Sequence, residues 1–295
     1  MAKFTEDQLN NFRFPPSDTE ESKLSNAERM IKDAIADSDE FKEKNTIVFG
    51  QGSYANDTNV KNNSDIDINV RLSDTVFIEL PLGSKQEDFG YTDSDYTYAE
   101  YKDAVERALV AKFGRSEVVR NDKCITVKAN NNRVEADVVP TLKYFRHDEN
   151  GGKAIGTKFI TDEGYPVINY PLQHIENGKQ KNSETQKRFK RLTRIFKRIR
   201  YKMIDDGVAV SDNITSFLIE CLLWNVPNQI YNNNDTWTER LRQAIIFLYN
   251  NTKTDEECKE WGEVSELLYL IRPSRKWSRE DINKFLLDVW RYLEF

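Results

Sequence analysis

The chain has 295 residues, which is enough to bury a substantial core in one large or two modest domains. Its formal net charge of −6 argues against a protein whose main task is to coat nucleic acid. The sequence contains no run of about 18 apolar residues and no signal-peptide core, so we expect a cytoplasmic protein with no membrane association. The three cysteines, Cys124, Cys221 and Cys258, are widely spaced, which predicts reduced thiols.

The first predicted elements surround a pair of glycines. Residues 1–24 are polar and are expected to form an N-terminal arm, and a capping box at 25–28 predicts a helix that runs to about residue 42. A β-branched and aromatic strand at 46–49 then stops at Gly50 and Gly52. Such a strand, ending in glycines, is typical of a buried strand that leads into a functional turn.

Further strands and one helix follow a polar loop. Strands are predicted at 65–70 and 75–80, and helical spacing is evident over 98–113, where Gly114 closes the helix. An Asn-rich turn joins two alternating runs at 124–128 and 133–140, which is a hairpin signal, and short strands are expected between 153 and 168.

The second half of the chain is predicted to be helical. Helices are expected over 183–206, 214–225, 236–251 and 279–293, the last with Ser278 as its N-cap. Strands first and helices second predict an α+β protein in which a mixed sheet with flanking helices, residues 1–170, precedes a helical domain, residues 171–295. We expect the active site in a cleft between the two.

Carboxylates recur on one face of two predicted strands. Residues 65–70 alternate polar and apolar types, so Asp65 and Asp67 share a face while the apolar residues enter the core. In the second strand of the hairpin, Glu135 and Asp137 also share a face. Because repulsion among carboxylates held side by side is relieved by a cation, the pattern predicts a metal site.

Three carboxylates facing a glycine turn suit nucleotidyl transfer. A nucleoside triphosphate carries about four negative charges, which two Mg²⁺ ions shared by carboxylates can neutralise. Gly52 would let the backbone approach the phosphates, and Ser53 adds a backbone N–H and a hydroxyl donor. The chemistry expected is in-line displacement of pyrophosphate by a hydroxyl.

Several segments carry a family resemblance: Gly52-Ser53, Ser64-Asp65-Ile66-Asp67-Ile68, Glu135-Ala136-Asp137-Val138-Val139-Pro140, Tyr170–Gly178 and Ile214–Cys221. Together they resemble the polymerase-β-like nucleotidyltransferase superfamily. More narrowly, they resemble the bacterial cGAS/DncV-like nucleotidyltransferases (CD-NTases) of clade E, the CdnE-type synthases. The resemblance covers roughly residues 25 to 230.

The resemblance implies roles for particular residues. Asp65, Asp67 and Asp137 would be catalytic Mg²⁺ ligands, with Mn²⁺ able to substitute. Gln51, Gly52 and Ser53 would bind the donor nucleotide, and Ser216 would contact its triphosphate. A basic helix would supply a further triphosphate contact, for which we choose Arg191 over Arg188; both flank the apolar face formed by Leu192, Phe196, Ile199 and Met203.

The resemblance also implies a function. Asn169 falls in the segment that lines the base pocket in relatives, where an asparagine accompanies uridine use; an amide presents a donor and an acceptor to uracil. The implied enzyme joins two NTPs, with UTP and ATP favoured, into a cyclic dinucleotide such as cyclic UMP-AMP or cyclic di-UMP. The product would activate an effector protein in anti-phage signalling.

Alternative interpretations remain open. Glu135 competes with Asp137 for the third ligand position. The same carboxylates would also serve a nucleotidyltransferase that extends RNA ends or modifies a protein, or a nucleotide-binding pseudoenzyme. His174 is expected to pack or hydrogen-bond and His147 to be exposed, since the chemistry needs no histidine. We expect a monomer that does not bind duplex nucleic acid.

Overall fold

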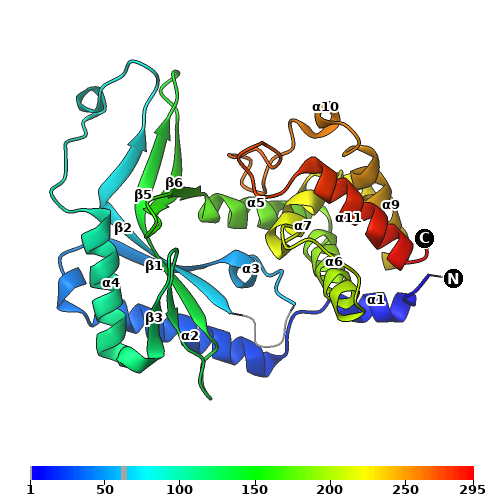
Figure 1. The fold of residues 1–295 in the computed structure, drawn as a ribbon, viewed down its shortest axis with the longest axis horizontal. Coiled ribbons are helices and arrows are strands. Elements are labelled where there is room, and N and C mark those ends of the chain that lie inside the picture. The colour runs from blue at the N-terminus through cyan, green and yellow to red at the C-terminus, as the bar shows by residue number, and fades with distance from the viewer. Residues whose placement is uncertain (1, 61–64) are drawn as a thin grey trace. The chain divides into compact units, whose positions relative to one another are not determined.

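The structure is a computed structural model that describes residues 2–60 and 65–295. It confirms the expected α+β class, a mixed sheet with flanking helices followed by a helical region (Figure 1). The last four residues of the predicted polar loop, 61–64, lie outside the described residues. The strands are β1 (Thr46–Gln51), β2 (Ile66–Glu79), β3 (Val118–Arg120), β4 (Ile125–Val127), β5 (Ala136–His147), β6 (Lys153–Ile160) and β7 (Pro166–Asn169).

Most of the helices follow the last strand of the sheet in the sequence. The α-helices are α1 (Glu6–Phe12), α2 (Asp18–Ala36), α3 (Gly52–Ala55), α4 (Tyr98–Phe113), α5 (Pro171–Glu184), α6 (Arg188–Asp205), α7 (Ser216–Trp224), α8 (Asn228–Asn232), α9 (Trp237–Asn250), α10 (Asp255–Cys258) and α11 (Arg279–Tyr292). Three short 3₁₀ turns, Asp39–Phe41, Gln86–Phe89 and Arg115–Glu117, complete the described elements.

One sheet contains all of the described strands. Its order is β1-β2-β5-β4-β3, and β6 and β7 continue from the far part of β5. β2 and β5 pair in parallel, and the other pairs are antiparallel. The two strands expected at 65–70 and 75–80 are a single strand, β2, with a register shift between Leu72 and Val76. The sheet therefore has one long central strand that begins beside the predicted carboxylates.

The core of the sheet unit lies on one face of β2. Ile66, Ile68, Val70 and Leu72 are almost completely buried and pack with apolar residues of α2 and α4. This is the alternation expected when a strand buries one face. The intervening residues, among them Asp67 and those that follow at every second position, therefore lie on the opposite face.

Packing divides the chain into two compact units. The sheet unit comprises residues 17–54 and 61–172, and the helical unit comprises 1–16, 55–60 and 173–295. The boundary predicted between residues 170 and 171 stays a prediction. The expected polar arm is wrong in part, because residues 6–12 form helix α1 and Leu9 is buried in the core of the helical unit.

Two helix boundaries differ from those expected. The helix predicted from the capping box at 25–28 starts earlier, at Asp18, with Ser17 as N-cap. The helix predicted over 183–206 is interrupted, because Gln186 and Lys187 adopt left-handed backbone conformations with φ of 51° and 65°. The apolar face predicted on the second part, α6, is confirmed as buried core. Ser278 caps α11 as predicted, accepting a hydrogen bond from the Asp281 N–H.

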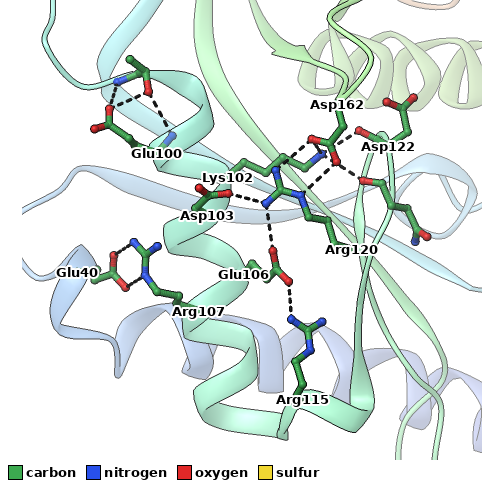
Figure 2. Close-up of polar contacts among 12 residues, drawn as sticks. Glu40, Glu100, Lys102, Asp103, Glu106, Arg107, Arg115, Arg120, Asp122 and Asp162 are labelled. Carbon is green, nitrogen blue, oxygen red and sulfur yellow. Dashed lines mark hydrogen bonds and ion pairs between the residues drawn. The ribbon is translucent and has the colours of Figure 1, made fainter.

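An ion-pair network braces the sheet unit (Figure 2). The Lys102 ammonium, almost fully buried on α4, donates to the Asp162 carboxylate at 2.8 Å and to the carbonyl of Asp122 at 2.8 Å. Arg120 on β3 donates to the same carboxylate and to that of Asp103. A buried ammonium with several oxygen partners is satisfied, so this network ties α4 to the turn after β6.

The remaining sequence predictions concern cysteines and membranes. Cys124, Cys221 and Cys258 are free thiols, as predicted. No helix in the described part of the chain has the length and apolar composition needed to cross a bilayer.

Candidate functional site

The glycine turn after β1 lies directly against a carboxylate. Gly52 has a φ of +68°, a left-handed conformation that favours glycine. A Cβ atom placed on Gly52 would lie 2.0 Å from the Oδ2 atom of Asp67. Only a residue without a side chain leaves room for this carboxylate, so the turn and Asp67 are built as one unit.

Strand register brings two of the predicted carboxylates together. Asp67 on β2 is the direct partner of Asp137 on β5, and Gln51 at the end of β1 is the direct partner of Asp67. Thr126 on β4 lies opposite Asp137 and donates from its Oγ1 to the Asp137 Oδ1 at 2.6 Å. Direct partners share a face of a sheet, so these side chains all lie on the face opposite the apolar core.

The pKa values of two carboxyl groups at this site are raised. Burial, together with the charges of Asp137 and Asp65, raises the pKa of Asp67 to about 6. Burial and the same two aspartates also raise the pKa of Glu135. Carboxylates that raise one another's pKa values repel each other when they are ionised, and a bound cation would relieve that repulsion.

The chemistry of this donor set fits Mg²⁺, which prefers carboxylate oxygens. Asp67 and Asp137 are adjacent, and Asp65 is close enough to raise the pKa of Asp67. Within residues 2–60 and 65–295, no three His, Cys, Asp or Glu side chains are already arranged as a complete set of metal ligands. Metal binding by Asp65, Asp67 and Asp137 therefore stays a prediction.

Between the two candidates for the third ligand, strand geometry favours Asp137. It is the register partner of Asp67 and its carboxylate is held by Thr126. Glu135 lies one residue before β5 begins, although its backbone carbonyl accepts a hydrogen bond from the Ile66 N–H. Alternation alone did not distinguish the two, because both lie on one face, whereas the family motif favoured Asp137.

A buried asparagine holds Gln51 in place, and sequence reasoning missed it. The Asn69 side chain donates to the Gln51 carboxamide oxygen at 3.1 Å and accepts from the Thr141 hydroxyl at 2.8 Å. Asn69 is almost fully buried on the same face of β2 as Asp67. The signal was available, since residue 69 continues the alternation that begins at residue 65.

Asn169 lies at the end of β7, on the face that carries the carboxylates. It is the direct partner of Thr157 on β6, which in turn is the partner of Lys143 on β5. Lys143 is six residues from Asp137 along one strand, so all four side chains share a face. Asn169 is exposed, and its backbone carbonyl accepts a hydrogen bond from the Thr157 hydroxyl at 3.3 Å. Asn169 is thus held by its backbone, and its side chain remains accessible.

In the helical unit, Arg191 lies in a strongly positive environment. Burial and the charges of Arg13, Arg194 and Arg188 lower the pKa of its guanidinium. Arg188 donates to the Asn232 side chain, whereas among the described residues Arg191 has no hydrogen-bond or ion-pair partner. A half-buried arginine among other arginines is suited to an anionic ligand.

Ser216 occupies the first turn of α7. Thr215 is the N-cap of that helix, and the Ser216 hydroxyl lies 3.2 Å from the hydroxyl of Tyr201. Backbone N–H groups in a first helical turn are available to an anion. The phosphate-contacting role that the resemblance implies for Ser216 stays a prediction.

The two histidines differ in how well the sequence predicted them. His174 is buried, and its Nε2 lies 3.1 Å from the Glu220 carboxylate, which confirms a hydrogen-bonding role. His147 was expected to be exposed, and this is wrong. It is half-buried, hydrogen-bonded to the Tyr91 hydroxyl at 2.9 Å and packed against Phe89 and Phe145, because β5 extends to this residue.

Comparison with known proteins identifies relatives along the whole chain. Residues 4–152 match the Second Messenger Oligonucleotide or Dinucleotide Synthetase domain, and residues 176–294 match the cGAS/DncV-like nucleotidyltransferase C-terminal helical domain. The cyclic dipyrimidine nucleotide synthase CdnE of Cecembia lonarensis is 61% identical over 100% of both chains. The cyclic dipurine nucleotide synthase of Elizabethkingia meningoseptica is 37% identical over 99% of both. The structure of the Rhodothermus marinus CdnE c-UMP-AMP synthase with Apcpp and Upnpp superposes with a TM-score of 0.85 at 28% identity, over 98% of this chain and 97% of that one.

Proposed function

We propose that this chain, which belongs to the cGAS/DncV-like nucleotidyltransferase family, joins two NTPs into a cyclic dinucleotide and releases pyrophosphate. One observation of the site carries the proposal. Asp67 and Asp137 are register partners on adjacent strands, and Gly52 leaves room for the Asp67 carboxylate against a turn that can receive phosphates. The relatives at 61% and 37% identity are cyclic nucleotide synthases, which supports the same reaction class.

The proposed roles follow from the chemistry of each group. Asp65, Asp67 and Asp137 would hold Mg²⁺, which when bound neutralises triphosphate charge and lowers the pKa of an attacking hydroxyl. Gly52 and Ser53 lie in a turn whose backbone N–H groups can donate to phosphate oxygens. Thr126 would orient Asp137, and Asn69 would orient Gln51, through their side-chain hydrogen bonds. Neither residue would touch the substrate.

Two residues of the helical unit are proposed to bind the triphosphate. The Arg191 guanidinium would donate to phosphate oxygens, and its arginine neighbours disfavour leaving that charge without an anion. Ser216 would donate from its hydroxyl and from the first turn of α7.

We further propose a uridine-containing product. Asn169 presents an exposed carboxamide on the sheet face that carries the carboxylates, and a carboxamide can donate to and accept from the edge of uracil. The 61% identical relative is a dipyrimidine synthase, which supports this choice, whereas the 37% identical relative is a dipurine synthase. By the family resemblance, the product would activate an effector protein in anti-phage defence.

Product analysis tests the proposal. The purified chain would be incubated with ATP, GTP, CTP and UTP, singly and in pairs, with Mg²⁺ or Mn²⁺, treated with phosphatase and analysed by mass spectrometry. A phosphatase-resistant cyclic product that requires UTP is expected. A purine-only cycle would retain the synthase and reject the role of Asn169.

Two variants test the carboxylates, and results on the parent separate the alternative functions. Asp67→Asn and Asp137→Asn should each abolish product while NTP binding remains measurable. No cyclic product from the parent, together with labelling of an RNA or protein acceptor, would replace the synthase by a transferase to a macromolecule. Absence of all transfer with retained NTP binding would favour a pseudoenzyme.

A further inference from the structure

A buried carboxylate in the helical unit binds three side chains from distant parts of the sequence. The Oε2 of Glu220, on α7, accepts from the Thr58 hydroxyl at 2.6 Å and from the Lys197 ammonium at 3.0 Å. The Oε1 lies 3.1 Å from the Nε2 of His174 on α5. The Lys197 ammonium also donates to the Thr58 hydroxyl at 2.8 Å. We refer to Thr58, His174, Lys197 and Glu220 as the Glu220 cluster.

Every member of the Glu220 cluster is buried. Thr58 is 0% and Lys197 is 1% exposed. Burial alone would raise the pKa of Glu220, but the Lys197 charge and the His174 and Thr58 hydrogen bonds hold it far below its usual value. A buried ion pair is stable only with good geometry and further hydrogen bonds. The positions of these four side chains are therefore tightly specified.

The same helix holds the rest of the segment that contains Thr58. Arg194, one turn before Lys197 on α6, donates to the Asp57 backbone carbonyl at 2.7 Å and also binds the Asp57 carboxylate. Arg198 donates to the Val60 carbonyl at 3.4 Å. Lys197 adds a contact to the Thr58 carbonyl at 3.3 Å. Three cationic side chains of α6 thus fix three backbone carbonyls of residues 55–60.

The position of this segment in the sequence gives the contacts a functional meaning. Ala55 is the last residue of α3 and the first of the segment 55–60. This segment packs with the helical unit, whereas residues 17–54 pack with the sheet unit. The short α3 therefore ends in a segment that side chains of α6 hold by several hydrogen bonds. Ser216, one turn before Glu220 on α7, is on the helix that supplies the carboxylate.

We propose that Thr58, Lys197 and Glu220 are positioning residues that fix the segment 55–60 and, through the peptide chain, the orientation of the Gly52-Ser53 turn toward a nucleoside triphosphate. The inference rests on the proposed function for the role of that turn. None of the three is required to touch the nucleotide. The expected effect is selective for one part of the nucleotide. Loss of the Glu220 cluster should weaken binding of the triphosphate and leave binding of the base and sugar unchanged.

Thr58→Val tests the proposal, because valine keeps the shape of threonine and removes its hydroxyl. We expect kcat/KM to fall at least about tenfold, since displacements near 1 Å at a distance from the chemistry can have effects of that size. The dissociation constant of the NTP should rise, whereas that of the matching NMP should not. Thr58→Ser, which retains the hydroxyl, should restore both values to near those of the parent.

A matched control is available on α6. Thr193 is also fully buried, and its hydroxyl donates to the Phe189 carbonyl one turn earlier in the same helix. Thr193→Val should leave the ratio of NTP to NMP affinity unchanged, even if it alters thermal stability. A Thr58→Val protein with the parental ratio would overturn the proposal.

A second variant covers the case in which Thr58→Val fails to fold. The double change Lys197→Met and Glu220→Gln removes both charges together and so leaves no unpaired buried charge. The same selective loss of triphosphate affinity is expected, and an unchanged ratio would contradict the proposal. The dissociation constants of NTP and NMP are measured without turnover. They therefore remain informative if the parent makes no cyclic product, an outcome that would reject only the proposed function.

Discussion

Gly52→Ala is the substitution for which the structure predicts the most specific effect. The added methyl group would lie 2.0 Å from the Asp67 Oδ2 and 2.9 Å from its Cγ. Real Cβ atoms do not approach other heavy atoms closer than about 3.0 Å, so the methyl group and the carboxylate must separate by at least about 1 Å. Because the backbone at residue 52 is held between β1 and α3, we expect the Asp67 side chain to move.

Two effects contribute, and their magnitudes differ. A left-handed conformation costs a residue with a Cβ about 1–2 kcal/mol, which lowers the free energy of unfolding by that amount. Displacing a reacting group by about 1 Å can reduce the rate about a hundredfold. We therefore expect Gly52→Ala to remain folded, with a modest loss of stability and a loss of product formation of about two orders of magnitude.

Gly90→Ala is the matched control. Gly90 has a φ of +75°, close to that of Gly52, but a Cβ there would meet no atom within 4 Å. Urea denaturation should show similar losses of stability for the two variants, and pyrophosphate release should be impaired only in Gly52→Ala. If Gly52→Ala formed product at the parental rate, the contact between the turn and Asp67 would have no catalytic significance.

Three further predictions concern other residues. Thr126→Val removes the hydroxyl that donates to Asp137 and should raise the Mg²⁺ concentration needed for half-maximal activity about tenfold, whereas Thr126→Ser should leave it unchanged. Equal Mg²⁺ requirements for Thr126→Val and the parent would argue against a role for this contact. Asn69→Leu removes the buried partner of Gln51 and should raise the KM for NTP. It should also lower the free energy of unfolding, measured in urea, by about 1–3 kcal/mol. An unchanged KM would show that Gln51 does not contribute to NTP binding. Burial lowers the pKa of Lys181 from 10.5 to about 8, so the unfolded chain binds more protons than the folded chain above about pH 8. The free energy of unfolding of the parent, minus that of Lys181→Met, should therefore rise between about pH 8 and 10, by at most about 1.4 kcal/mol per pH unit. A parallel pH dependence of the two proteins would show that the lysine is not buried in this way.

The parts of the site that the sequence predicted are those encoded locally. Alternation over residues 65–70 places Asp67 opposite the core, and a strand ending in glycines predicts the turn at Gly52. Both depend on neighbouring residues only. The same alternation places Asn69 beside Asp67 on that face. The partners of Asn69 and Thr126, however, depend on how separate strands pair, and one sequence does not specify that register.

The errors in the fold have a similar origin. The break between α5 and α6 occurs at Gln186 and Lys187, neither of which is a residue type that predicts a left-handed conformation. The polar arm was expected from composition. Glu6 in that region in fact binds the backbone N–H groups of Trp237 and Thr238 in the first turn of α9, a contact across more than two hundred residues of sequence. Capping by such a distant residue leaves no local pattern.

The assignment of residues 55–60 to the helical unit limits how this enzyme can be recombined with its relatives. A chimera joined near residue 170 would combine a foreign α6 and α7 with the native Thr58, and the Glu220 cluster would assemble only if both parents shared its geometry. Exchange of the helical unit should therefore carry residues 1–16 and 55–60 with it. In this fold, the module that can be inherited as a whole is discontinuous, and it includes the short segment 55–60 that follows the glycine turn.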